Sequence, residues 1–227
     1  MSNHATNADD KAQRLLNVAG EVFAEKGQSA TVREICSKAQ CSVAAINYYF
    51  GDKQQLYLQC VQTACEQKEE KYPLPSSEQL AEVTDPPVML QRFLRAITER
   101  LVAKSSESWH NTLMLREVIN PSKGVRDILT TPFRRDFHNL RSIFEELFAG
   151  IESPEELIVD FATQTLARCM FLRTGKNLRS ILHLDTESNE IPEHYADSIS
   201  RSIIDQVNQT RQMHDQPVWQ WPNPVNT

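Results

Sequence analysis

Residues 31–53, which read TVREICSKAQCSVAAINYYFGDK, combine hydroxyl, amide and cationic side chains. Hydroxyl and lysine side chains can hold a nucleic-acid backbone in register without reading its sequence. The side chains that offer such groups to phosphates are Thr31, Tyr48, Tyr49 and Lys53. Plain packing of the two tyrosines and helix capping by the threonine are the alternative interpretations.

The same segment offers side chains that can reach the edges of bases. Asn47 has the amide group that pairs with adenine, although an exposed and uninvolved asparagine would look the same in sequence. The small apolar side chains that can contact thymine methyl groups are Val43, Ala44 and Ala45. Together with the phosphate-binding types, these residues indicate contact with DNA.

Two short helices separated by a tight polar break are expected to position these side chains. Thr31 and Glu34 have the spacing of a capping box, which opens a helix over residues 32–39. After the break, Ser42 is a suitable N-cap for a second helix over residues 43–50. This layout is that of a helix-turn-helix.

Further helices are expected on both sides of this unit. Apolar spacing indicates one from Asp9 or Asp10 to Lys26, where Gly27 supplies a stop. Later segments with helical spacing are residues 53–71, 88–101, 109–118, 125–148, 154–174 and 192–213. A bend at Pro132 is one option for helix 125–148, and Ser153 is the expected cap of helix 154–174. No segment alternates as a strand does, so the predicted fold class is all-α.

Proline clusters at residues 72–77 and 84–87 mark the linker region of the chain. We therefore predict an N-terminal helix-turn-helix domain at residues 9–55 and a larger helical body at 56–215, joined by helix 53–71. The remaining residues, 216–227, are rich in proline and tryptophan and form either an ordered strap or a mobile tail. Two tryptophans favour the strap, because large apolar side chains are rarely left in water.

The charge of the chain is unevenly distributed. The net charge is -6, but residues 1–55 hold six Lys/Arg and six Asp/Glu, so the acidity lies in the remainder. This suits a small DNA-reading module on a body that does not touch DNA. No signal peptide and no apolar run of membrane-spanning length is visible, so a cytoplasmic protein is expected.

The cysteines and histidines do not form a recognisable metal or redox motif. The five cysteines lack CxxC spacing and are interpreted as small buried hydrophobes, with a redox-sensing thiol at Cys60 or Cys65 as the alternative. No HxxxH or HExxH pattern links His110, His138, His183 and His194, so no metal and no cofactor is predicted.

An enzyme is not expected either. Asp136, His138 and Ser142 are near one another in sequence, but no nucleophile-elbow glycines accompany them.

Residues 14–61 resemble the DNA-binding domain of the TetR family of bacterial transcriptional regulators. The features that carry the resemblance are Ala19 and Phe23 before Gly27, the TVREI start, Ala39-x-x-Ser42, INYYF, Lys53 and Leu56. The segment SVAAINYYFGDKQQLY, and LMLREVINPS at residues 113–122, are similar to the CecR-like subgroup. The chain departs from the family where Gln40 replaces the usual glycine and where Ala45 and Asn47 replace threonine and tyrosine.

The resemblance implies a homodimer that places the second helix of each helix-turn-helix in a major groove of a palindromic operator. It also implies a C-terminal domain that dimerises and holds a small organic effector, whose binding releases a repressor from DNA. By the family's pattern Arg33 contacts a base or a phosphate. The complete candidate DNA-binding set is Thr31, Arg33, Ser42, Val43, Ala44, Ala45, Asn47, Tyr48, Tyr49 and Lys53.

Candidates for lining an effector cavity are Trp109, His110, Met114, Phe137, His138, Phe161, Cys169 and Met170. Membership of an ordinary core is the alternative for each of them. Two other functions stay open: a DNA-binding dimer whose C-terminal domain is a protein-interaction module without an effector, and a cytosolic helical enzyme.

Overall fold

The structure is a computed structural model of the 227-residue chain and describes residues 3–102, 109–175, 181 and 195–221. The described elements, in chain order, are α1 (Asn3–Lys26), the 3-10 helix η1 (Gly27–Ser29), α2 (Val32–Ala39), α3 (Val43–Phe50), α4 (Lys53–Lys71), α5 (Ser77–Ala81), α6 (Pro86–Val102), α7 (Trp109–Ile119), α8 (Val125–Leu147), α9 (Glu155–Thr174) and α11 (Tyr195–Met213). No strand occurs within the described ranges, and the predicted all-α fold class is confirmed.

The chain divides into two compact units. The N-terminal unit comprises residues 1–71 and 104–133, and the C-terminal unit comprises residues 72–103 and 134–227. Helix α8 contains Pro132 without interruption and contributes to both units. The division into functional domains at residues 9–55, 56–215 and 216–227 stays a prediction, because compactness alone does not say which residues act together.

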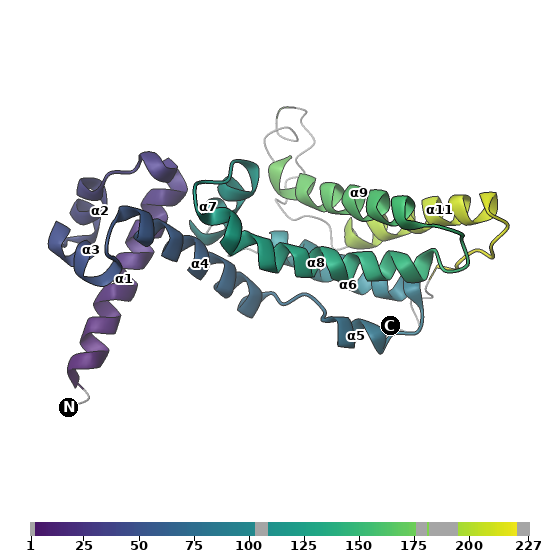
Figure 1. The fold of residues 1–227 in the computed structure, drawn as a ribbon, viewed down its shortest axis with the longest axis horizontal. Helices are drawn as coiled ribbons and strands as arrows, with labels where there is room; N and C mark the ends of the chain where they lie inside the picture. Colours follow the sequence, from purple (N-terminus) through teal and green to yellow (C-terminus); the bar gives the residue numbers. More distant parts are fainter. Residues whose placement is uncertain (1–2, 103–108, 176–180, 182–194, 222–227) are drawn as a thin grey trace. The chain divides into compact units, whose positions relative to one another are not determined.

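In the N-terminal unit, α7 packs against both α1 and α4, although it lies far from them in sequence (Figure 1). The core contains Phe23 and Ile46, both fully buried, and the rings of Phe23 and Tyr57 meet edge to face with centroids 4.8 Å apart. Edge-to-face contact is a favoured aromatic arrangement. The helix-turn-helix therefore shares its core with α7.

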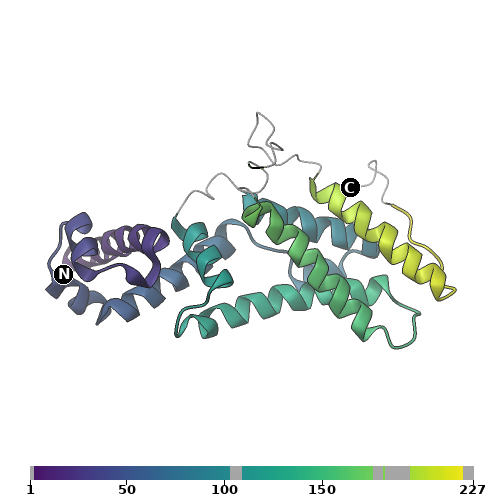
Figure 2. The same ribbon diagram turned by 90° about the horizontal axis from the view of Figure 1, so that it is seen from above.

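In the C-terminal unit, α6 packs against α9 and α11 (Figure 2). An aromatic cluster fills the centre: the rings of Phe144 and Phe161 lie 5.8 Å apart, and those of Phe148 and Phe161 lie 5.0 Å apart, edge to face. The core of this unit is thus built separately from that of the N-terminal unit.

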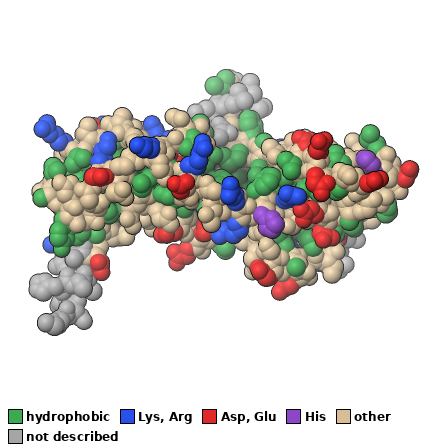
Figure 3. Space-filling model, viewed as in Figure 1, with side chains coloured by type: hydrophobic (Ala, Val, Ile, Leu, Met, Phe, Trp, Pro, Cys, Tyr) green, Lys and Arg blue, Asp and Glu red, His purple; other side chains and the backbone are tan. Residues whose placement is uncertain are grey.

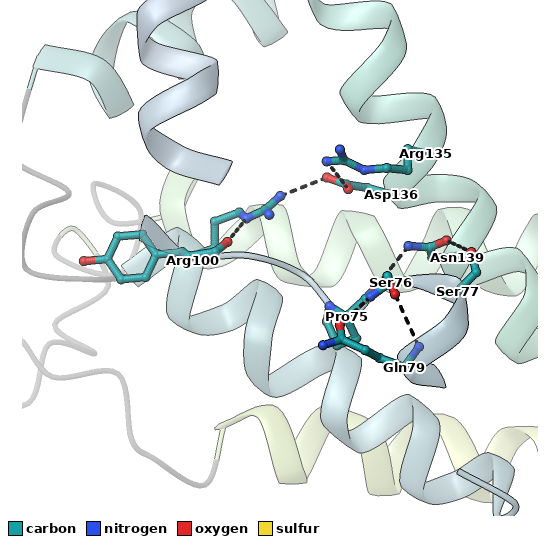
Figure 4. A network of polar contacts seen from close by, with 9 residues as sticks. Pro75, Ser76, Ser77, Gln79, Arg100, Arg135, Asp136 and Asn139 are labelled. Atoms are coloured by element: carbon teal, nitrogen blue, oxygen red, sulfur yellow. Dashed lines mark hydrogen bonds and ion pairs between the residues drawn. The ribbon is translucent and has the colours of Figure 1, made fainter. Parts of the chain in front are cut away.

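Polar side chains fasten the proline-rich segment after α4 to the C-terminal unit (Figure 4). Arg100 donates to an Asp136 oxygen over 3.0 Å and to the Tyr72 carbonyl over 2.6 Å. Asn139 donates to the Pro75 carbonyl over 3.1 Å and accepts from the Ser77 hydroxyl over 2.8 Å. The segment predicted to be a linker is therefore held in place.

A short helix, α5, occupies part of that segment and was not predicted. Its N-cap is Ser76, whose hydroxyl accepts from the Gln79 backbone, while the Gln79 side chain accepts from the Ser76 backbone. This is a capping box, which the surrounding prolines obscured in the sequence.

The C-terminal tail follows the strap alternative as far as Trp221, the last described residue. The Trp219 indole donates to the Leu147 carbonyl over 2.9 Å, and its backbone exchanges two hydrogen bonds with Asn208. Arg211 lies 4.9 Å from the Trp219 ring centre, within the range of a cation–π contact. Both tryptophans pack against the core of the C-terminal unit.

Three helix starts differ from the prediction. Helix α6 begins at Pro86 and not at residue 88. Helix α1 begins at Asn3 and not at Asp9 or Asp10, since residues 3–8 contain no glycine or proline that would stop a helix. Helix α9 has Pro154 as its N-cap, without a side-chain hydrogen bond, because Ser153 adopts a left-handed conformation at φ 52°. The predicted start of the last helix at residue 192 lies outside the described residues.

Candidate nucleic-acid interface

The start of α2 is fixed by the predicted capping box. The Glu34 backbone N–H donates to the Thr31 hydroxyl over 3.2 Å, and the Thr31 backbone N–H donates to the Glu34 carboxylate over 2.8 Å. The bond from Lys26 and the bonds from Thr31 lower the pKa of Glu34 to about 2. Because this pKa is depressed from 4.5, the capping contribution is complete above pH 4.5 and is lost as the pH falls toward 2.

The turn between α2 and α3 uses an unusual residue. Gln40 has φ 53° and ψ 47°, the left-handed conformation that glycine adopts at little cost. Of the two alternatives left by a glutamine in the usual place of glycine, strain or a shifted turn, the left-handed conformation favours strain. Ser42 then caps α3 by accepting from the Ala45 N–H over 3.3 Å, as predicted.

The structure brings the candidate DNA-binding residues together around α3 and the start of α2. Those exposed to solvent are Thr31, Arg33, Ser42, Val43, Ala44, Asn47 and Tyr48, and those partly buried are Ala45, Tyr49 and Lys53. Tyr48 is 81% exposed, which is unusual for so large a side chain. Buried Ile46 anchors the opposite side of the same short helix. Helix α3 thus presents a polar and small-residue face to solvent.

Lys53 is tied to the body of the N-terminal unit. Its ammonium group donates to the Gln28 carbonyl over 2.8 Å and to the Ala30 carbonyl over 3.1 Å. A lysine ammonium has three donors, so one remains for a phosphate. Nothing in the sequence indicates this second role, because the partner carbonyls lie more than twenty residues earlier in the chain.

On the face drawn in Figure 3, basic side chains are spread over the N-terminal unit and acidic side chains gather over the part of the C-terminal unit that contains α9 and α11. This agrees with the charge division read from the sequence. A surface with little net charge can still bind DNA when a few of its cationic side chains contact phosphates.

Helix α7 supports the helix-turn-helix through a close contact. The Trp109 ring packs directly on Gly20 of α1, so that a Cβ at this position would lie 2.5 Å from the ring atoms Cε2 and Cε3. Trp109 also stacks on His110, with ring centres 3.7 Å apart. The glycine was not singled out in the sequence, since its partner is distant along the chain.

We expect Gly20→Ala to destabilise the N-terminal unit by about 1–3 kcal/mol, because a methyl group must displace the indole from a packed site. Urea denaturation followed by circular dichroism measures the loss. The double variant with Trp109→Leu removes the obstructing ring and should recover part of the stability. If Gly20→Ala lowers the stability equally in the presence and absence of the Trp109 ring, the destabilisation arises from another contact of α1.

A buried carboxylate joins α7 to α4. Glu117 is fully buried and accepts hydrogen bonds from the Tyr57 hydroxyl, from the Ser122 backbone over 2.6 Å and from the Ser122 hydroxyl over 2.8 Å. Burial, followed by the bond to Glu117, raises the pKa of Tyr57, so the tyrosine remains a donor at neutral pH. Glu117 and Ser122 belong to the LMLREVINPS segment, in which the sequence resembles the CecR-like subgroup.

The candidate effector residues do not form one cluster. Trp109, His110 and Met114 pack in the N-terminal unit, whereas Phe137, Phe161, Cys169 and Met170 pack in the core of the C-terminal unit. His138 is exposed, and its backbone carbonyl accepts from Ser142 over 3.1 Å. We therefore keep only the C-terminal members as candidates for one site.

The residues considered for catalysis and metal binding have structural contacts. Asp136 is bound by Arg100 and Arg135, and the Ser142 hydroxyl is directed to the backbone of its own helix. Across the described residues, no group of three or more His, Cys, Asp and Glu side chains is arranged to hold a metal ion; His183 and His194 lie outside them. No described helix is long and apolar enough to cross a membrane.

Two family descriptions match the chain. Residues 15–60 match the bacterial regulatory proteins of the tetR family, and residues 86–210 match the C-terminal domain of the HTH-type transcriptional dual regulator CecR. CecR of Shigella flexneri is 48% identical over 50 residues, which span 22% of this chain and 22% of that protein.

Solved structures share the fold over most of the chain. AibR, crystallised with isovaleryl coenzyme A and operator DNA, has a TM-score of 0.59 at 13% identity, covering 88% of this chain and 97% of AibR. The TetR-family regulator PfmR from Thermus thermophilus has a TM-score of 0.58 at 19% identity, covering 84% of this chain and 96% of PfmR. These identities are too low to carry over residue roles.

Proposed function

The chain belongs to the TetR family, in its CecR-like group, and is a DNA-binding transcriptional regulator and not an enzyme; from this premise we propose that it is a homodimeric repressor released from a palindromic operator by a small organic effector. The observation that carries the proposal is the exposed polar face of α3, held on a helix-turn-helix in which the N-caps of α2 and α3 are both formed. The function requires a cytoplasmic protein.

The proposed DNA contacts follow from exposure and chemistry. Phosphates are contacted by Thr31, Arg33, Ser42, Tyr48, Tyr49 and Lys53, and base edges by Val43, Ala44, Ala45 and Asn47. Phosphate contacts fix the register of a protein on the duplex, while base contacts carry the sequence preference. The small side chains at the start of α3 allow its backbone to approach the floor of the groove.

Exposed apolar side chains on α9 support the dimer. Val159 is 44% exposed and Phe171 is 45% exposed, and a second copy would remove both from water. Two α3 helices would then read half-sites about 34 Å apart, one turn of DNA. Sedimentation velocity at micromolar concentration is expected to give the mass of two chains; a monomer across that range would contradict the dimer.

Unpartnered hydroxyls inside the C-terminal unit support an effector site. Thr98 on α6 and Thr165 on α9 are 7% and 1% exposed, and neither hydroxyl has a hydrogen-bond partner. Arg100 and Asp136 of this unit are paired with each other. An uncharged, largely apolar ligand with hydrogen-bonding groups suits such an interior. AibR shows that the fold accommodates both an organic ligand and operator DNA.

A ligand screen by thermal stabilisation tests the effector. A true effector raises the melting temperature in proportion to the logarithm of its concentration and weakens DNA retention. Thr165→Val keeps the shape of the side chain and removes the hydroxyl, so the variant should fold and respond less. If no compound in a broad screen stabilises the protein, the alternative of an effector-free protein-interaction module is favoured.

Lys53→Ala is expected to weaken binding to all DNA sequences similarly and to lower the slope of log K against log salt by about one unit. Gel-shift titrations at several salt concentrations measure the slope. Asn47→Ala is the matched comparison, because it should change the preferred sequence and leave the slope unaltered. If Lys53→Ala lowers the stability but does not change the slope, Lys53 does not contact a phosphate and acts only through its hydrogen bonds to the carbonyls of Gln28 and Ala30.

A further inference from the structure

The end of α2 is closed by a Schellman motif. Gln40 is the left-handed residue, its N–H donates to the Ser37 carbonyl over 3.4 Å, and the Cys41 N–H donates to the Cys36 carbonyl over 3.0 Å. In this motif the side chains of the two residues that the longer bond joins come into contact. Here both are cysteines, so the turn of the helix-turn-helix brings two thiols together.

Both thiols are free, and they differ in access to solvent. Cys36 is 8% exposed, whereas Cys41 is half-buried at the start of the turn. Burial raises the pKa of the Cys41 thiol, and the neighbouring Cys36 thiol raises it further. The effect of Cys36 on the pKa of Cys41 agrees with the backbone geometry, which places the two side chains next to each other.

The remaining cysteines lie in different surroundings. Cys60 and Cys169 are fully buried, and Cys65 is 7% exposed. The Cys60 thiol donates to the Leu16 carbonyl, and the Cys65 sulfur lies 3.3 Å from that of Met114. Burial raises the pKa of Cys65 to about 11 and that of Cys169 to about 12. A peroxide in solvent cannot reach thiols buried in this way, so these three cysteines are inert.

We propose that a hydroperoxide oxidises Cys36 and Cys41 to an intramolecular disulfide and that this modification switches off DNA reading. The Cys41 thiolate, as the accessible one, attacks a peroxide oxygen; the O–O bond breaks, an S–O bond forms, and an alcohol or water leaves. The Cys36 sulfur then attacks the sulfenic acid sulfur, and water leaves as the S–S bond forms. Two thiols have lost two protons and two electrons, and the peroxide has been reduced.

The position of the bond explains its consequence. Cys41 directly precedes Ser42, the N-cap of α3, so a covalent link to Cys36 draws the start of the recognition helix toward α2. The raised pKa of Cys41 leaves little thiolate at neutral pH, which makes the reaction slow and faster in alkali. The disulfide therefore forms under sustained exposure to peroxide and not during a brief one. The effect on DNA rests on the proposed function, whereas the disulfide does not.

The test uses the full-length reduced protein, treated with hydrogen peroxide at pH 8, blocked with an alkylating agent and digested with trypsin. Lys38 separates the two cysteines, so trypsin places Cys36 on residues 34–38 and Cys41 on residues 39–53. We expect mass spectrometry to find these two peptides joined, and dithiothreitol to separate them. Affinity for a duplex selected by the reduced protein should fall at least about tenfold and recover on reduction.

Three variants make the result decisive. Cys41→Ser and Cys36→Ala should give no joined peptide and keep their affinity in peroxide, while Cys169→Ala should behave as the unchanged protein. The absence of the joined peptide, its formation only between two chains, or its formation without a change in affinity would each overturn the proposal. Failure of the reduced protein to select any duplex would overturn the proposed function and the switch, but the joined peptide would still decide the disulfide.

Discussion

Glu117→Ala is expected to lower the free energy of unfolding by about 3–5 kcal/mol, because several buried donors lose their acceptor at about 1–3 kcal/mol each and the removed side chain leaves a cavity. The carboxylate accepts from the Tyr57 hydroxyl and from both the backbone and the hydroxyl of Ser122. Without it, donors in a fully buried site lose their partner and a cavity opens between α4 and α7. Urea denaturation measures the loss.

Matched variants separate the network from a general effect of charge. Glu21→Ala removes an exposed carboxylate of the same unit, which pairs with Lys38 over 3.0 Å, and should cost less than about 1 kcal/mol. Tyr57→Phe removes one donor, with an expected cost of about 1–3 kcal/mol. If Glu117→Ala costs no more than Glu21→Ala, α7 is not anchored to α4 through this carboxylate.

Arg211→Ala is expected to destabilise the C-terminal unit by about 2–4 kcal/mol, since several buried acceptors lose a shared donor. Arg211 is 3% exposed. Its guanidinium donates hydrogen bonds to the carbonyls of Pro217, Leu147 and Ala149 over 2.6, 2.8 and 2.9 Å. It also lies against the Trp219 ring. The variant should therefore release the strap as well as lower stability.

Two readouts follow the release of the strap. Denaturation gives the stability, and a red shift of tryptophan fluorescence reports exposure of Trp219. Arg201→Ala is the control, because Arg201 is exposed and its guanidinium lies 5.0 Å from the Trp221 ring centre; its loss should cost less than about 1 kcal/mol. A large loss of stability with unchanged fluorescence would show that Arg211 holds the end of α8 and not the strap.

The helix-turn-helix could be predicted from sequence because its signals are local. Thr31 and Glu34, three residues apart, form the cap of α2, and Ser42 forms that of α3. At Gln40, which occupies the usual place of a glycine, the sequence left strain and a shifted turn as alternatives, and the residue adopts the left-handed conformation. In each case the interacting groups are neighbours in the chain, so residue type and spacing contain the necessary information.

The contacts of α7 with α1 and α4 could not be predicted, because the contacting residues are far apart in the sequence. Gly20 meets Trp109, and Tyr57 meets Glu117, across intervals that no periodicity reveals. The segment that carries Trp109 and Glu117 lies within the predicted body at residues 56–215, and it packs against α1 and α4. The contact between Cys36 and Cys41 was overlooked for a different reason: each residue read alone is a small buried hydrophobe.

The central claim is that the face of α3 reads a two-fold symmetric DNA sequence. Selection of duplexes from a random pool by the full-length protein at physiological salt, followed by sequencing, tests it most directly. We predict enrichment of two inverted half-sites with centres about 34 Å apart, or a multiple of that spacing, and a changed motif when Asn47→Ala is used. A pool without an enriched motif, or the same motif for both proteins, would contradict the account.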